Sequence, residues 1–140
     1  MNRRQRTEIL IQGAPTLSKK LATIITDSYK CREVVAPRYG LTMVKMRESA
    51  QKSLFYLGEV LVTEAKVMIN NKIGVGIVVG MEDELALNLA IIDAAYNANL
   101  EETNDWKNDL LQEAERIKSN RAKEQQNLLK TKVDFQTMDI

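Results

Sequence analysis

Few side chains in this 140-residue sequence could carry chemistry, and their types narrow the possible reactions. The chain contains no histidine and a single cysteine, Cys31. Nucleophiles of the Ser-His-Asp and Cys-His kinds, histidine metal sites and Cys/His zinc sites are therefore excluded within the chain. Carboxylates, lysines or tyrosines would have to transfer the protons in an autonomous enzyme. We accordingly predict no metal site and no bound cofactor, and we assign no catalytic residue.

Asp93 is the carboxylate best placed for general-base chemistry, because it lies beside the apolar stripe of a predicted helix. A partly buried carboxylate can act as a general base. More often such a group pairs with a buried arginine or a backbone donor, and we favour that structural role. Glu59 and Glu64 are expected on opposite faces of a predicted strand, so we do not expect them to act as a catalytic pair.

The spacing of the glycines at 74, 76 and 80 is close to that of the dinucleotide-binding motif G-x-G-x-x-G. The third glycine comes one residue too late, however, and the first two lie inside a predicted strand rather than after it. Glycines within a strand often mark the close approach of another backbone. The helix start after Gly80 could bind an anion, but the acidic run from Glu82 to Glu84 would repel a phosphate.

A predicted hairpin and helix position these residues. Residues 60–69 and 73–79 have the alternation of strands, and Asn70-Asn71-Lys72 suits a tight turn between them. The first strand should bury one face, formed by Leu61, Thr63, Ala65, Val67 and Ile69. A helix is expected from after Gly80 to Ala98. Its apolar stripe consists of Leu85, Leu89, Ile92 and Tyr96, and alanines flank this stripe. A helix covering a hairpin is an α+β unit.

The flanking segments predict further helices and strands. Helices are expected at 4–12 and from Pro15, strands at 33–36 and 41–47 with Pro37 ending the first, and a polar loop at 48–52. The two helices could form a DNA-reading helix-turn-helix. We favour a helical hairpin that packs on the sheet, because base-reading side chains are few and the formal charge is only +1.

The C-terminal part is predicted to be a mostly polar helix with a narrow apolar stripe, followed by an extended tail. Trp106, Leu110, Ala114 and Ile117 form the stripe, and residues 118–127 are almost entirely polar. We predict one domain, 1–140, in which 104–140 is a helix and tail ordered by a partner.

The fold class is α+β, an antiparallel sheet covered by helices. Charges interrupt every apolar run and cysteine is scarce, so a cytoplasmic protein is expected.

Five segments of the chain are distinctive when taken together: 38–44, 58–63, the return strand ending in Gly80, Ala90-Ile91-Ile92-Asp93-Ala94 and the tail from Val133 to Met138. In this order they resemble the PhnG family, whose members are components of the carbon–phosphorus lyase system. The resemblance runs from about residue 17 to 138.

The resemblance implies a non-autonomous subunit in phosphonate catabolism. The family acts with subunits H, I and L to replace the adenine of ATP by methylphosphonate, giving α-D-ribose 1-methylphosphonate 5-triphosphate. Subunit I would hold the main active site, the PhnG protein would form a stable hetero-oligomeric core with subunits H, I and J, and L would join transiently. ATP is then a substrate of the complex. We expect the tail to contact the partner through Val133, Asp134, Phe135, Thr137 and Met138.

Three positions depart from the family pattern. Glu64 stands where relatives usually have arginine, and Met81 and Leu85 stand where they usually have arginine and histidine. Any contact made by those side chains in relatives is absent here. The alternative function is a DNA- or protein-binding module that uses the N-terminal helices, and a free-standing carboxylate enzyme built on Asp93 is the third.

Overall fold

The computed structural model describes residues 1–47 and 54–138 and has the α+β fold that the sequence predicts. Within these residues the elements follow the order α1 (Arg3–Gln12), α2 (Pro15–Ser28), β1 (Arg32–Arg47), β2 (Leu54–Ile69), β3 (Lys72–Val79), α3 (Asp83–Asn97), the 3-10 helix η1 (Glu101–Asp105) and α4 (Trp106–Met138). The strands form one antiparallel sheet in the order β1-β2-β3.

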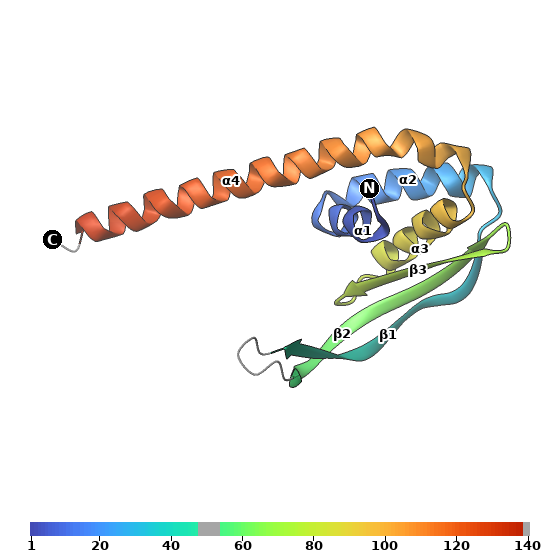
Figure 1. Ribbon diagram of the computed structural model, residues 1–140, viewed down its shortest axis with the longest axis horizontal. Helices are drawn as coiled ribbons and strands as arrows, with labels where there is room; N and C mark the ends of the chain where they lie inside the picture. The colour runs from blue at the N-terminus through green and yellow to red at the C-terminus, as the bar shows by residue number, and fades with distance from the viewer. Residues whose placement is uncertain (48–53, 139–140) are drawn as a thin grey trace.

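The described helices all lie on one side of the sheet. Figure 1 shows α3 against the sheet, α1 and α2 beyond α3, and α4 along the outermost side. The prediction that the α1–α2 hairpin packs on the sheet is therefore wrong, because α3 lies between them. The middle position of α3 explains why its residues 89–95 are all buried, since it is covered by the sheet on one side and by helices on the other.

The β2–β3 hairpin matches the prediction closely. Asn70 and Asn71 adopt positive φ angles of 49° and 63° at the turn, as a tight hairpin needs. The register runs without interruption from Ile69 opposite Lys72 to Val62 opposite Val79. The predicted buried face of β2 is confirmed from Thr63 to Ile69. Leu61 is an exception and remains exposed, because it lies beyond the first turn of α3.

The strand β1 corrects the prediction of two strands separated by Pro37, since one continuous strand covers both. It lies at the edge of the sheet, and its register with β2 shifts between Val35 and Arg38. An edge position or a bulge tolerates a proline, because no ladder hydrogen bond is lost there. The strand β2 likewise begins at Leu54, earlier than predicted. The predicted loop at 48–52 lies outside the described residues.

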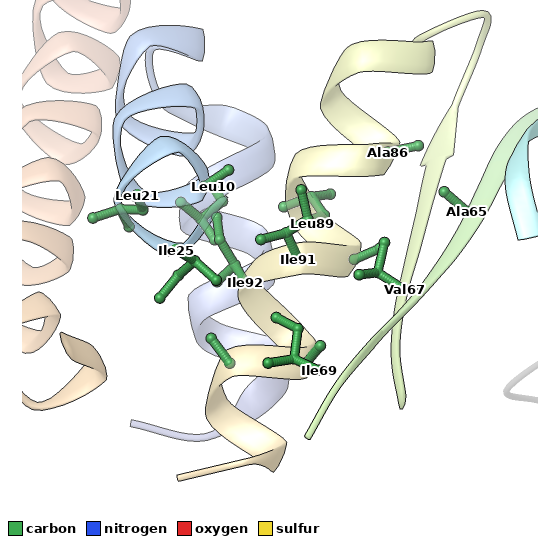
Figure 2. Close-up of a cluster of buried hydrophobic side chains, with 14 of the residues drawn as sticks. Leu10, Leu21, Ile25, Ala65, Val67, Ile69, Ala86, Leu89, Ile91 and Ile92 are labelled. Atoms are coloured by element: carbon green, nitrogen blue, oxygen red, sulfur yellow. The ribbon is translucent and has the colours of Figure 1, made fainter. Parts of the chain in front are cut away.

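The glycines of β3 allow α3 to lie directly on the sheet. A Cβ atom added to Gly74 would stand 2.1 Å from the backbone nitrogen of Ala94, and one added to Gly76 would stand 2.1 Å from the carbonyl oxygen of Ala86. The close backbone approach that the glycines predict is therefore confirmed. The other side of α3 builds an aliphatic core with α1 and α2, in which Leu10, Leu21, Ile25 and Ile92 meet (Figure 2).

The helix α4 begins in the core and leaves the body of the molecule. Trp106 and Leu110 are buried, whereas every residue from 118 to 129 is exposed, and Figure 1 shows α4 extending well past the other helices. The predicted extended tail is wrong for residues 133–138, whose backbone continues the helix to Met138. The segment from Trp106 to Met138 contains no proline or glycine and is rich in strong helix formers, which explains this continuation.

Candidate functional site: an arginine-lined cleft and a projecting helix

Asp93 of α3 joins three elements. Its Oδ1 accepts from Arg6 Nη2 at 3.1 Å and lies 3.0 Å from Arg3 Nε, so that two positions one turn apart on α1 reach the same oxygen. Its Oδ2 accepts from Arg3 Nη2 at 3.1 Å and from the backbone N–H of Val75, in β3, at 2.9 Å. The carboxylate therefore ties α1 and β3 to α3.

The second side chain of this cluster, Arg6, is deeply placed. Its side chain is 11% exposed, and its guanidinium carbon lies 3.9 Å from the centre of the Tyr96 ring. Burial lowers the pKa of Arg6 from its usual value, and the opposing charge of Asp93 partly offsets that effect. The pKa of Tyr96 is raised, mainly by burial. An arginine this buried needs a charged partner, and Asp93 supplies it.

The geometry supports the structural role predicted for Asp93. Each carboxylate oxygen already has two nitrogen partners, and both expected kinds of donor, a buried arginine and a backbone N–H, are present. A carboxylate saturated in this way has no free position from which to take a proton from a substrate. The hypothesis of a carboxylate enzyme built on Asp93 therefore finds no support in the geometry.

A cleft of about 440 Å³ lies beside this cluster, between α1 and β3. The α1 side provides Arg3, Arg4 and Thr7, and the sheet side provides Val75 and Ile77. Arg4 pairs with Glu8 at 3.3 Å on the surface of α1. Arg3, Arg4 and Arg6 stand against the carboxylates of Glu8 and Asp93 in the lining, so the cleft carries an excess of positive charge.

The N-terminal helices offer little to the DNA-binding alternative. Arg3 and Arg6 both direct their guanidinium groups to Asp93. A guanidinium held by a carboxylate is poorly available to a phosphate backbone, on which affinity for DNA mostly depends. The α1–α2 pair packs on α3, not on the sheet as the sequence predicts, and its role is structural.

The other carboxylates that sequence reasoning considered lie apart from the cleft. Glu64 lies on the helix-free face of the sheet, 3.5 Å from Arg38 and 3.6 Å from Lys66. Glu59 occupies the opposite face, as predicted, because its position in β2 is an odd number of residues from Glu64. The two carboxylates therefore do not meet.

The start of α3 has its own internal partner. Thr63 Oγ1 donates to the carbonyl of Gly80 at 2.6 Å and accepts from the N–H of Glu82 at 3.0 Å. Asp83 and Glu84 lie in the first turn of the helix, as the sequence predicts. Of the positions that depart from the family pattern, Met81 is exposed and Leu85 is half-buried against the core.

The residues predicted to contact a partner lie at the far end of α4. The backbone of Val133, Asp134, Phe135, Thr137 and Met138 is helical, and their side chains lie outside the described part of the structure. Their role as contacts remains a prediction. Just before them, Leu128 and Leu129 are exposed, so apolar side chains do stand on the projecting part of α4.

Sequence reasoning did not assign Arg3 and Arg6 a role, although they are the partners of Asp93. Their spacing of three places them on one face of a helix, which was the available signal. Among the side chains that the structure describes, those of residues 1–43 and 58–129, no three acidic or cysteine groups gather as metal ligands. In the same part of the chain, every helix is too short or too polar to cross a lipid bilayer.

The comparison with protein families agrees with the resemblance seen in the sequence. The model of the phosphonate metabolism protein PhnG matches residues 1–139, almost the whole chain. The chain belongs to this family. The fold and the cluster around Asp93 are thus those of a PhnG-family protein of phosphonate metabolism. A comparison with curated proteins gave no match.

Proposed function

We propose that this PhnG-family chain is a non-autonomous subunit of the carbon–phosphorus lyase complex. In this role it supports the transfer of methylphosphonate to the ribose C1 of ATP, with release of adenine, in phosphonate catabolism. The partners are subunits I, H and J, with L joining transiently, in the cytoplasm. The family match over residues 1–139 is the observation that carries the proposal.

The chemistry of the chain supports a subordinate role. The sequence has no histidine, and the buried carboxylate of Asp93 is saturated by Arg3, Arg6 and Val75. Cys31 is half-buried, and burial raises the pKa of its thiol, which disfavours a reactive thiolate. Another subunit would therefore supply the groups that act on the substrate.

The projecting part of α4 supports a role as a partner-binding subunit. From residue 118 to Met138 this helix spans roughly 30 Å at the usual rise per residue. Its described side chains from 118 to 129 are all exposed. A helix without packing is marginally stable in water, because most helical stability in proteins comes from tertiary contacts. A surface of another subunit would provide those contacts.

The first test removes the segment predicted to bind. A chain lacking residues 133–140 should no longer co-elute with subunit I when the two are co-expressed, because the apolar anchors of the tail are gone. Phe135→Ala and Met138→Ala should each weaken co-elution, whereas Gln136→Ala, a position in the same turn that is not a predicted contact, should leave it unchanged. Undiminished complex formation by the truncated chain would contradict the proposed contact.

Activity of the assembled complex is the second part of this test. The full-length chain, added with subunits H, I and L to ATP and methylphosphonate, should permit release of adenine, and omission of the chain should abolish it. Adenine release that is equally fast without the chain would show that it is not a required subunit.

A further inference from the structure

The outer edge of β3 is closed at one end and open at the other. The N–H of Val75 donates to Asp93, and the C=O of Ile73 accepts from the amide nitrogen of Asn97 at 2.8 Å, so both groups point away from β2. In an antiparallel ladder every second residue directs its N–H and C=O to the same side. Ile77 and Val79 therefore also direct theirs outward, and no described residue bonds to them across that edge.

The two edges of the sheet differ in how well they are protected. The strand β1 contains Pro37 and three register shifts, which lie between Glu33 and Val35, between Val35 and Arg38, and between Val44 and Lys45. Such irregularities are devices that prevent an edge from pairing with another strand. The register of β3 against β2 has no shift over its whole length. The β3 edge is thus regular and available for pairing.

The surroundings of the open end suit an acidic, extended segment. The residues Ile77 and Val79 are 53% and 69% exposed, which is unusual for large aliphatic residues. The arginine-lined cleft runs beside Val75, Gly76 and Ile77. On its other wall the side chain of Arg4 is 87% exposed, and the lining as a whole carries more positive than negative charge.

We propose that the open half of the β3 edge binds an extended segment of another subunit, which adds a fourth strand to the sheet and places a carboxylate beside Arg4. This inference rests on the proposed function, which supplies the partner. The backbone groups of Ile77 and Val79 would make the ladder hydrogen bonds. Asp93 occupies the N–H of Val75 and Asn97 the C=O of Ile73, so a ladder that extended in that direction would lack these two hydrogen bonds.

The charge in the cleft favours such a segment over a second copy of this chain. Arg4 already pairs with Glu8, but the lining as a whole keeps an excess of positive charge. A second β3 edge would present Ile77 and Val79, which carry no charge, and would leave that excess unmatched. A partner strand that ends in or carries an aspartate or glutamate satisfies both the backbone groups and the arginine.

Hydrogen exchange in the assembled complex tests the inference. The chain is co-expressed with subunits H, I and J, and exchange is measured at single-amide resolution for the chain alone and in the complex. The amides of Ile77 and Val79 should exchange at least tenfold more slowly in the complex, while those of Ala90 and Ala94 inside α3 should change little. Unchanged exchange at Ile77 and Val79 in an intact complex would overturn the inference and leave the proposed function standing.

Two other outcomes have distinct meanings. If no complex forms, the proposed function and the inference that rests on it both fail. If the amides of Ile77 and Val79 become protected when the chain alone is concentrated and forms dimers, the occupant is a second copy and the inference is wrong.

Matched substitutions separate the backbone from the side chain. Ile77→Pro removes the outward N–H without removing a bond to β2, so the chain should fold but bind the partner at least tenfold more weakly. Ile77→Thr keeps the N–H and should bind within about threefold of the original chain. Equal binding by Ile77→Pro, in a variant with unchanged thermal unfolding, would contradict strand addition.

A second pair of variants tests how much the charge of Arg4 contributes to binding of the partner segment. Arg4→Ala should weaken binding severalfold and reduce its dependence on salt, because an exposed charge pair is screened by ions. Lys20→Ala, an exposed position on α2 away from the cleft, serves as the control and should bind as the original chain does. Equal affinity and equal salt dependence for both variants would refute an acidic partner segment.

Discussion

Asp93→Asn is the substitution that most directly tests how the N-terminal helix is held. The change keeps the shape of the side chain and one oxygen that can accept from Val75, but it removes the charge opposite Arg6. Removing one partner of a buried ion pair destabilises a protein by about 3–5 kcal/mol, because the remaining charge is left buried and uncompensated. Only the Arg6 contact belongs to that class, since its side chain is 11% exposed.

The Arg3 contact should contribute much less. The side chain of Arg3 is 61% exposed, and exposed ion pairs contribute about 0–1 kcal/mol. The retained amide oxygen also limits the loss. We therefore expect Asp93→Asn to lower the free energy of unfolding by about 3 kcal/mol, the lower end of the range for a broken buried pair.

Urea unfolding provides the assay. Trp106 is the only tryptophan in the sequence, is buried and contacts the Tyr96 ring edge-on, with ring centres 5.6 Å apart, so its fluorescence should report the packing around Arg6. With a urea dependence of about 1–3 kcal/mol per molar for a small protein, the midpoint should fall by about 1–3 M.

Two further variants make the result specific to the Asp93–Arg6 pair. Arg3→Ala should shift the midpoint only slightly, because that arginine is mostly in solvent. In the double variant Asp93→Asn with Arg6→Met, the loss should be smaller than the sum of the two single losses by about 1–3 kcal/mol, as expected for residues in contact. A stability for Asp93→Asn within about 0.5 kcal/mol of the original chain, the range of ordinary surface changes, would refute this account of the cluster.

Two predictions concern the packing of α3 and the attachment of α4. Gly76→Ala would bring a Cβ atom to within 2.1 Å of the carbonyl oxygen of Ala86, so it should lower stability by at least about 1–3 kcal/mol in urea unfolding, whereas Gly40→Ala, which has no atom within 4 Å of its added Cβ, should have a small effect. The pKa of Glu113 is lowered mainly by its hydrogen bond from Arg116 and also by the backbone N–H of Ala14, at 3.1 Å. A lowered carboxyl pKa stabilises the folded chain above the unfolded value of 4.5, and that contribution is lost as the pH falls through the folded pKa. Glu113→Gln should therefore destabilise the chain at pH 7 but have less effect at pH 3; an equal loss at both pH values would contradict the assignment.

The parts of the fold that the sequence predicts correctly are those whose local structure is determined by residues close together in the chain. The Asn70-Asn71 turn and the alternation on either side of it specify the β2–β3 hairpin without reference to the rest of the molecule. The glycines at 74 and 76 are a second local signal, because glycine within a strand often marks the place where a neighbour approaches closely. The alanines of α3 provide that neighbour.

The parts that sequence reasoning missed depend on position in the sheet or on distant partners. Pro37 ends a central strand but is tolerated at an edge, and nothing local shows that β1 is an edge strand. The partners Arg6 and Asp93 are 87 residues apart in the sequence, so no periodicity connects them. The sequence analysis predicts an extended tail from Val133 to Met138, whereas local helix propensity continues α4 through it.

The position of Asp93 connects the stability of the fold to the shape of the proposed binding edge. The same carboxylate that neutralises Arg6 also accepts from the outward N–H of Val75. If Asp93 had served only the arginine, the edge of β3 would be open as far as the Asn97 contact at Ile73, and a partner strand could pair in more registers. Asp93 occupies the N–H of Val75 and Asn97 the C=O of Ile73, so Ile77 and Val79 are the residues of this edge whose outward N–H and C=O both remain for pairing. The contact that holds α1 on α3 would thereby also restrict the register of the partner strand.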